Sequence, residues 1–173
     1  MIMNKIIAIV TLGLQLVLTF IVIFCIYMLF ALLDNDFGFD GLFGLFIIQP
    51  IFGIILSILT IIVCLILGLP IRLNKKINYW WTTNFYISII GAISGLTLLF
   101  LALLPNFNET VTVIINEQET SKQIPNSTLS YVGWFLTAFS LLHIYPPRQL
   151  TDRIRKMTSK KQVEKGATIQ FDK

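Results

Sequence analysis

The stretch IIAIVTLGLQLVLTFIVIFCIYMLFALL at residues 6–33 contains no acidic or basic side chain. Three further stretches, at residues 41–71, 77–108 and 128–147, share this property, with His143 as the one exception. A helix needs roughly 20 apolar residues to cross ~30 Å of hydrocarbon. The pattern therefore predicts an all-α integral membrane protein, an antiparallel bundle of four transmembrane helices. These spans are expected at about residues 6–33, 42–69, 81–104 and 129–145.

The composition leaves room for little else. The chain of 173 residues is 55% hydrophobic and 13% charged, whereas a soluble domain carries about 25% charged residues. We therefore expect one transmembrane domain at residues 1–147 and a basic cytoplasmic tail at residues 148–173. The apolar run after Lys5 is longer than that of a signal peptide, which predicts a retained helix. The heavy use of Ile, Asn, Lys and Phe favours an AT-rich bacterial genome, so we expect the cytoplasmic (inner) membrane.

The charges between the apolar stretches alternate in sign. The links at residues 34–40 and 106–127 are mostly acidic or polar. The other link and the tail are basic, and their cationic residues are Arg72, Lys75, Lys76, Arg148, Arg153, Arg155 and Lys156. Because positively charged loops stay on the cytoplasmic side, the pattern predicts a multi-pass topology with both termini cytoplasmic. Tyr79, Trp80 and Trp81 flank the basic link as an aromatic anchor.

Two segments leave their local structure open. Pro50 lies inside the second stretch and removes a backbone donor, so this stretch is either one kinked helix, which we favour, or a short interfacial piece followed by a span. The link before the fourth span contains TVTVII at residues 110–115, whose alternation favours a strand. We expect a short extracytoplasmic loop there that folds as a β-hairpin, and the alternative is a loop without regular structure.

Small residues repeat along one side of each predicted helix. In lipid such residues mark helix–helix contacts, because they let backbones approach closely. The sequence therefore predicts packing faces, with Leu99 at the edge of the face on the third span. The helix-packing residues are Gly53, Ser57, Gly91, Gly95 and Gly133. The alternative is a narrow, weakly polar cavity lined by the same side chains.

Three polar side chains interrupt the apolar stretches: Gln15, Gln49 and His143. The amide of Gln15 must find a partner inside the bilayer, so we expect an interhelical hydrogen bond. Gln49 adjoins the Pro50 kink, where it satisfies freed backbone groups or binds a small polar ligand. His143 lies about one turn from the end of its span, where we expect the inner headgroup region to solvate it.

These residues offer little reactive chemistry. No carboxylate, lysine or pair of metal ligands shares a depth in the bilayer with a base, so we expect no catalytic residue, no metal, no cofactor and no enzymatic activity. The predicted partners are the lipid bilayer and another membrane protein or a second copy of the chain, and not nucleic acid.

Three functions remain open at this point. The first is a small non-enzymatic membrane protein that acts by helix–helix association, as a subunit or accessory of a membrane complex. The four-span topology also resembles that of some colicin-type immunity proteins, which implies a second hypothesis, an immunity-type protector against a membrane-active toxin. The third is a channel or carrier for a small solute, formed by an oligomer.

Overall fold

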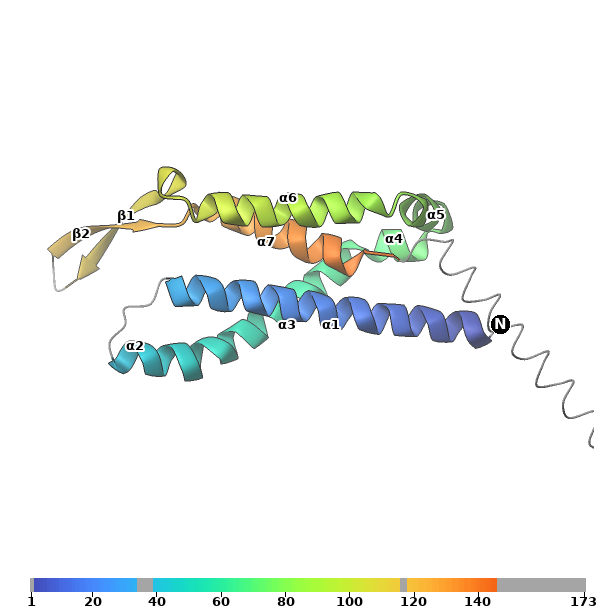
Figure 1. Cartoon of the computed structure of the whole chain (residues 1–173), viewed down its shortest axis with the longest axis horizontal. Coiled ribbons are helices and arrows are strands. Elements are labelled where there is room, and N and C mark those ends of the chain that lie inside the picture. The colour runs from blue at the N-terminus through green and yellow to red at the C-terminus, as the bar shows by residue number, and fades with distance from the viewer. Residues whose placement is uncertain (1, 34–38, 116–117, 146–173) are drawn as a thin grey trace, which may run out of the picture.

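The computed structural model describes residues 2–33, 39–115 and 118–145, and the chain is mostly helical (Figure 1). The elements are α1 (Ile2–Leu33), α2 (Phe39–Phe43), η1 (Gly44–Ile48), α3 (Gln49–Leu67), α4 (Leu69–Leu73), α5 (Lys75–Thr83), α6 (Tyr86–Ala102), η2 (Pro105–Phe107), β1 (Glu109–Ile115), β2 (Gln118–Ile124) and α7 (Ser127–Leu142).

Two helical runs in the described part of the chain are long and apolar enough to cross a membrane. They are Ile9–Leu33 and Gly41–Leu67. A third candidate arises if α5 and α6, which meet at an angle of 72°, are counted as one broken span, and α7 is a shorter apolar helix. This finding confirms the membrane-compatible, helical character expected from the sequence.

α1, α6 and α7 run roughly along the length of the molecule, α3 crosses it obliquely, and the ends of the helices gather in two places (Figure 1). The start of α1, the α4–α5 pair and the end of α7 lie at one end, which we call the basic end because Arg72, Lys75 and Lys76 belong to it. The hairpin of β1 and β2 and the helix α2 lie at the other, the hairpin end. α7 packs most extensively against α6 and also contacts α1 and α3. It is therefore the helix on which the others converge.

The segment around Pro50 is one continuous helical run with a local π-helical turn, η1. Proline cannot donate a backbone hydrogen bond, and its ring crowds the carbonyl four residues earlier. The chain adapts by widening the preceding turn, so that the Gln49 N–H reaches the carbonyl of Gly44, five residues back. A π turn relieves such a conflict without ending the helix. Among the described residues, Gly41–Leu67 therefore form one continuous helical run rather than an interfacial piece followed by a span.

The expected third span at residues 81–104 is divided in the structure. α5 ends at Thr83, and α6 begins only at Tyr86 after the 72° bend. Asn84 explains the break, because both its backbone N–H and its side-chain Nδ2 donate to the Trp80 carbonyl (3.0 and 2.9 Å). These bonds satisfy the Trp80 carbonyl in the last turn of α5, so the helix ends there and the chain can change direction.

Glycines bring α6 and α7 into backbone contact. A Cβ atom built on Gly95 would lie 2.7 Å from the Thr137 nitrogen and 2.9 Å from the Gly133 carbonyl oxygen. A Cβ on Gly133 would in turn lie 2.8 Å from the Gly95 carbonyl and 2.9 Å from the side chain of Leu99. Gly91 faces the Ser140 hydroxyl in the same way. Leu99 is buried at this contact, so its expected place at the edge of the face was wrong.

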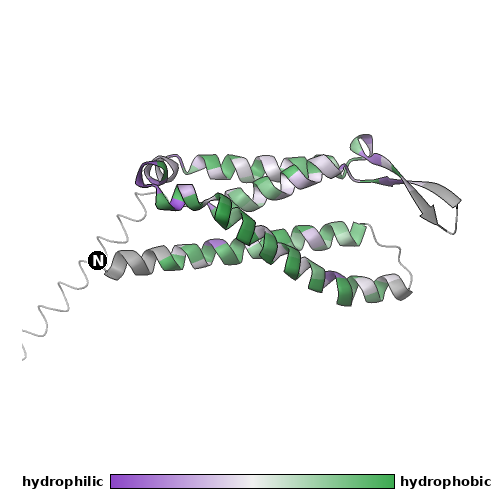
Figure 2. Cartoon of the chain, turned by 180° about the vertical axis from the view of Figure 1, so that it is seen from behind, coloured by the Kyte–Doolittle hydropathy of each residue, from purple (hydrophilic) through white to green (hydrophobic). Residues whose placement is uncertain are grey.

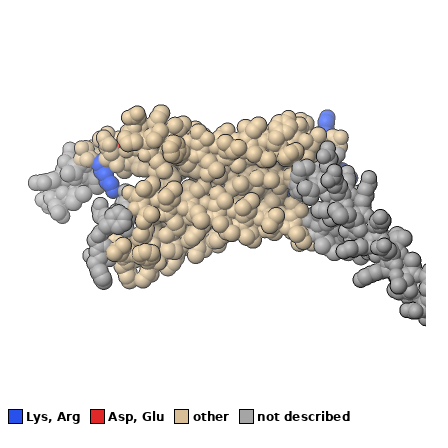
Figure 3. Space-filling view, viewed as in Figure 1, with Lys and Arg blue, Asp and Glu red and all other residues tan. Residues whose placement is uncertain are grey.

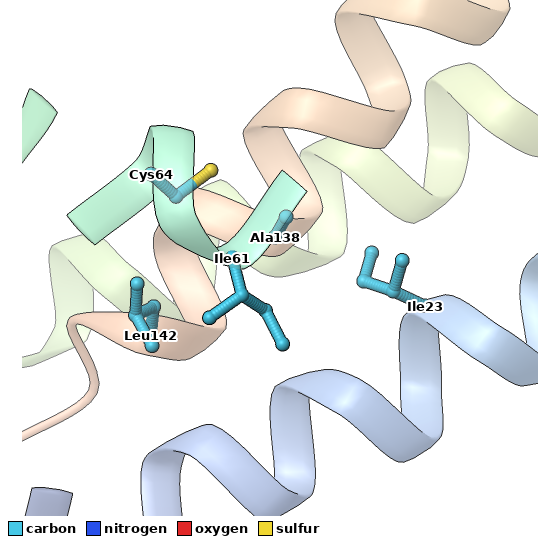
Figure 4. Close-up of a cluster of buried hydrophobic side chains, with 5 residues drawn as sticks. All are labelled: Ile23, Ile61, Cys64, Ala138 and Leu142. Atoms are coloured by element: carbon cyan, nitrogen blue, oxygen red, sulfur yellow. The ribbon is translucent and has the colours of Figure 1, made fainter. Parts of the chain in front are cut away.

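The apolar core is small and lies where α1, α3 and α7 meet (Figure 4). It is formed by Ile23, Ile61, Cys64, Ala138 and Leu142. α3 and α7 are also tied by a hydrogen bond, in which Trp134 Nε1 donates to Thr60 Oγ1 (3.0 Å). The core is thus centred on α7, and α6 adds to it only through its contact with that helix.

Most large apolar side chains point outward instead. Exposed Ile, Leu, Val and Phe occur along α1, α3, α6 and α7, and hydrophobic residues dominate the middle of these helices (Figure 2). On the face shown in Figure 3, the described charged side chains lie only toward the two ends. Such a continuous apolar exterior is far larger than the patches that soluble monomers expose.

The predicted β-hairpin is present. β1 and β2 pair antiparallel with Glu109 opposite Ile124 and Ile115 opposite Gln118. Its base is joined to the helices, because the Asn126 N–H donates to the Ala102 carbonyl at the end of α6 (3.3 Å). Ser127 Oγ also donates to Glu109 Oε2 (2.8 Å) at the start of α7. The hairpin therefore closes the α6–α7 pair at the end opposite the basic end.

The α6–α7 contact generates a test. Gly95→Ala places a methyl group against the backbone of α7, and overpacking of this kind costs about 1–3 kcal/mol. We expect a lower unfolding temperature in mild detergent. Gly13→Ala in α1 is the matched control, because no atom lies within 4 Å of the position that its new Cβ would occupy, and alanine favours a helix by up to about 1 kcal/mol over glycine. Equal unfolding temperatures for the two variants would contradict the close contact.

Candidate functional site

Side chains from four elements converge on the carbonyl groups of residues 142–144, at the end of α7 and just beyond it. The end of an α-helix leaves four carbonyls without intrahelical donors. Here Gln15 Nε2 of α1 donates to the Ile144 carbonyl (2.5 Å), and Arg72 Nη2 of α4 donates to the Leu142 carbonyl (3.1 Å). The carbonyl of His143 receives the two remaining donors, one each from α5 and α6. We call this set of residues (Gln15, Arg72, Trp81, Ser88 and His143) the α7 cap cluster.

The His143 carbonyl is the most heavily bonded group in the cluster. Ser88 Oγ donates to it at 2.7 Å, and Trp81 Nε1 donates to it at 3.0 Å. The Trp81 N–H is shared, because it also lies 2.9 Å from Ser88 Oγ. Buried carbonyls of this kind need donors from the protein where water is absent. The arrangement fixes α5, α6 and the end of α7 relative to one another.

The side chain of His143 is fully buried, with 0% of its surface exposed. Its Nδ1 donates to the Phe139 carbonyl (2.8 Å), and its ring stacks on that of Phe139 with centroids 4.4 Å apart. The other ring nitrogen, Nε2, faces Gly68 so closely that a Cβ atom at position 68 would collide with it. This nitrogen has no hydrogen-bond partner among the described residues. The expected solvation of His143 by lipid headgroups was therefore wrong, because the α3–α4 junction covers the ring.

Arg72 does not behave as a surface cation. Its Nη2 also lies 3.3 Å from Gln15 Oε1, so the guanidinium bridges α1 and the end of α7. A cation is favourable there, since the C-terminal end of a helix carries partial negative charge. Lys75 and Lys76 are exposed, as expected of membrane-surface residues. The remaining predicted basic residues lie outside the described part of the chain: Arg148, Arg153, Arg155 and Lys156.

The other predicted polar and small residues serve contacts within the chain. Gln15 is only 4% exposed and makes the interhelical bond described above. Gln49 Oε1 accepts a hydrogen bond from the Tyr27 hydroxyl (2.5 Å), which joins α3 to α1. Gly53 packs under Tyr27 and Phe24, and Ser57 is buried on the same helix. Together with the α6–α7 glycines, these residues are occupied by intrachain packing.

An open apolar groove runs between α3 and α7. Its volume is ≈ 450 Å³, and its lining is almost entirely apolar. It is lined by Cys64, Leu67, Tyr131, Val132, Phe135, Leu136 and Phe139. Most of the lining comes from α7, because only the last turns of α3 approach it there. The groove can hold an apolar chain or the side chains of another helix, and its lining residues include no carboxylate, histidine or lysine.

The described residues contain no cluster of three His, Cys, Asp or Glu side chains that could hold a metal ion. The two cysteines are unpaired, Cys64 in the core and Cys25 on an exposed position of α1. The polar chemistry of the described chain is therefore concentrated in the α7 cap cluster, where the donors are directed at backbone carbonyls.

Sequence reasoning missed two features of this region. The first is the inward role of Arg72, and the second is the Trp81–Ser88 pair that caps α7. One signal was present in the sequence. The proline pair at residues 146–147 ends the fourth apolar stretch, so the preceding carbonyls must take donors from other segments.

Comparison with known proteins finds no relative of this chain. No protein-family model matches it, and neither the curated proteins nor the solved structures contain a match.

The shared acceptor at His143 generates a double-mutant test. Ser88→Ala and Trp81→Phe each leave the His143 carbonyl with one donor, whereas the double variant leaves it with neither. An unsatisfied buried acceptor costs about 1–3 kcal/mol. We therefore expect the loss in free energy of unfolding for the double variant to exceed the sum of the two single losses, as measured by denaturation in mild detergent.

The control pairs Trp81→Phe with Thr97→Ala, which removes an exposed hydroxyl that bonds only within α6, to the Ile93 carbonyl. That pair does not share an acceptor, so its losses should add. Additive losses for Ser88→Ala with Trp81→Phe would contradict a shared role at the His143 carbonyl.

Proposed function

We propose that this chain is a four-span protein of the bacterial cytoplasmic membrane, with both termini cytoplasmic, and that it acts by associating with another membrane helix. The observation that carries the proposal is the open apolar groove between α3 and α7. It is a concave, almost entirely apolar surface on the exterior of the helices. The activity proposed is binding, without catalysis or a cofactor.

Membrane insertion is supported by the distribution of apolar and charged groups. Large apolar side chains are exposed along all four long helices, a cost in water that disappears in hydrocarbon. α6 and α7 have 17 and 16 residues, which correspond to ~25 Å at 1.5 Å per residue. Such short helices fit a bilayer of ~30 Å if it thins locally or if flanking residues complete the crossing.

A surface that binds a partner helix must be one that is not already used for packing within the chain. The small-residue faces are used for packing inside the chain: Gly91, Gly95 and Gly133 join α6 to α7, and Gly53 lies against α1. The groove is different, because Val132 and Phe135 remain exposed there. In lipid, helix association depends on van der Waals packing and shape. A transmembrane helix that enters the groove gains such contacts, whereas flexible lipid chains fill it less well.

The partner is a helix of another membrane protein or of a second copy of this chain. A toxin helix, as in the immunity-type hypothesis, belongs to the first class. Binding in the groove would take place within the bilayer and would consist of apolar packing. The affinity for the partner should therefore not depend on ionic strength.

The proposed topology can be tested by cysteine labelling. In a chain whose two cysteines are replaced by alanine, Ser121→Cys lies in the hairpin and Thr83→Cys lies at the basic end, and both positions are exposed. A membrane-impermeant maleimide should label Ser121→Cys in intact cells and Thr83→Cys only after permeabilisation. Labelling of Thr83→Cys in intact cells would overturn the proposed orientation.

The proposed groove can be tested by photocrosslinking in native membranes. A benzophenone amino acid at Phe135, in the groove, should give a discrete protein adduct. The same amino acid at Ile93, an exposed position of α6 outside the groove lining, should react mainly with lipid. Equal protein adducts from both positions would argue against a specific site.

A groove-filling substitution sharpens this test. Val132→Trp places a large side chain in the groove and should remove the Phe135 adduct. Ile93→Trp is the matched control, since Ile93 is 59% exposed and Val132 is 51% exposed. The control should retain the adduct and the unfolding temperature of the wild type. An adduct that survives Val132→Trp would contradict helix binding in the groove.

A further inference from the structure

The helix α5 lies across the basic end of the molecule. It makes an angle of 72° with α6, and in Figure 1 it is seen almost end-on while α6 runs across the picture. Trp81 sets its rotation, because the indole N–H points inward to Ser88 Oγ (2.9 Å) and to the His143 carbonyl (3.0 Å). With Trp81 held inside, the opposite face of α5 must point outward.

Both ends of α5 are capped, so this short helix is well defined. Asn74 Oδ1 accepts hydrogen bonds from the backbone N–H groups of Lys76 (2.9 Å) and Ile77 (3.4 Å). At the other end, Asn84 Nδ2 donates to the Trp80 carbonyl (2.9 Å). Side-chain caps of this type stabilise a helix terminus by about 1 kcal/mol. The outward face of α5 is therefore a preformed surface.

That face combines cationic and aromatic side chains. Lys75 and Lys76 are exposed, and Tyr79 and Trp80 are 58% and 52% exposed. The described part of the chain gives neither lysine a carboxylate partner. Arg72, the third cation of the same link, is turned inward and bonds to the end of α7. The three cations of this link therefore have different roles: Arg72 caps the end of α7, whereas Lys75 and Lys76 point outward.

We propose that the outer face of α5 binds the phosphate-bearing headgroups of anionic phospholipids. Lysines near an anionic leaflet attract its lipids, and Trp and Tyr prefer the level of the headgroups, where the ring is half in hydrocarbon. A basic, aromatic helix that lies across the ends of the spans places both groups at that level. A free phosphate would use the lysines but not Trp80. The proposal rests on the proposed membrane insertion, and it is independent of helix binding in the groove.

The test uses the full chain in phosphatidylcholine vesicles that contain a minor fraction of brominated phosphatidylglycerol. Bromine on the acyl chains quenches tryptophan fluorescence on contact, and Trp80 reports from the face itself. We expect stronger quenching than with brominated phosphatidylcholine at the same fraction. Lys75→Gln and Lys76→Gln should each lower the relative affinity for phosphatidylglycerol about fivefold, and added salt should weaken the preference of the wild type.

Lys122→Gln is the control, because it removes one exposed lysine at the hairpin end. It should retain the preference, and Trp80→Phe should remove most of the excess quenching. An unchanged preference in the Lys75→Gln, Lys76→Gln double variant would overturn the proposal, as would an equal loss in Lys122→Gln. Displacement of the lipid by soluble glycerol phosphate would overturn it too, by indicating a site for free phosphate.

Two further outcomes separate this proposal from the proposed function. Quenching by both brominated lipids without a preference would overturn the headgroup proposal alone. An absence of quenching by either lipid would show that the chain does not enter the bilayer, which overturns this proposal and the proposed membrane insertion together.

Discussion

The end of α7 imposes the constraint on which the rest of the structure depends. Backbone carbonyls away from water need hydrogen-bond donors, and the fourth apolar stretch runs directly into a proline pair. Four elements supply the donors through Gln15, Arg72, Trp81 and Ser88. Removing any of these elements would leave polar groups unpaired, so the cap determines how α1, α4, α5 and α6 are arranged around α7.

The polar residues of the apolar stretches are likewise used within the chain. Gln15 and Arg72 serve backbone carbonyls, Gln49 bonds to Tyr27, and the His143 ring is enclosed between Phe139 and Gly68. These groups hold the helices together and leave an exterior that is apolar along the spans and cationic at one end. This exterior is the basis for the two proposed interactions, one through shape in the groove and one through charge on α5.

Hydropathy predicted the helical, membrane-compatible class because apolar length is a local property. The hairpin was predictable for the same reason, since the alternation in TVTVII is local. The break between α5 and α6 was not, because hydropathy averages over Asn84, whose side chain ends α5 by bonding to the Trp80 carbonyl.

The tertiary roles of single polar residues could not be read from spacing either. Counting positive charges treats Arg72 and the two lysines alike, and the carbonyl to which Arg72 donates lies 70 residues further along the sequence. The helical rise predicted how far His143 lies from the end of its span. It could not predict that the α3–α4 junction covers the ring, because this close approach requires a glycine at position 68.

Phe139 connects the two surfaces for which we propose roles. Its ring lines the groove between α3 and α7, stacks on His143, and meets the edge of Trp81 with centroids 6.2 Å apart. Trp81 in turn sets the rotation of α5. A helix bound in the groove as proposed would therefore contact Phe139, which packs against the tryptophan that orients α5. Because protein interiors are close-packed, the shape of the groove and the placement of α5 depend on the same packed group of rings.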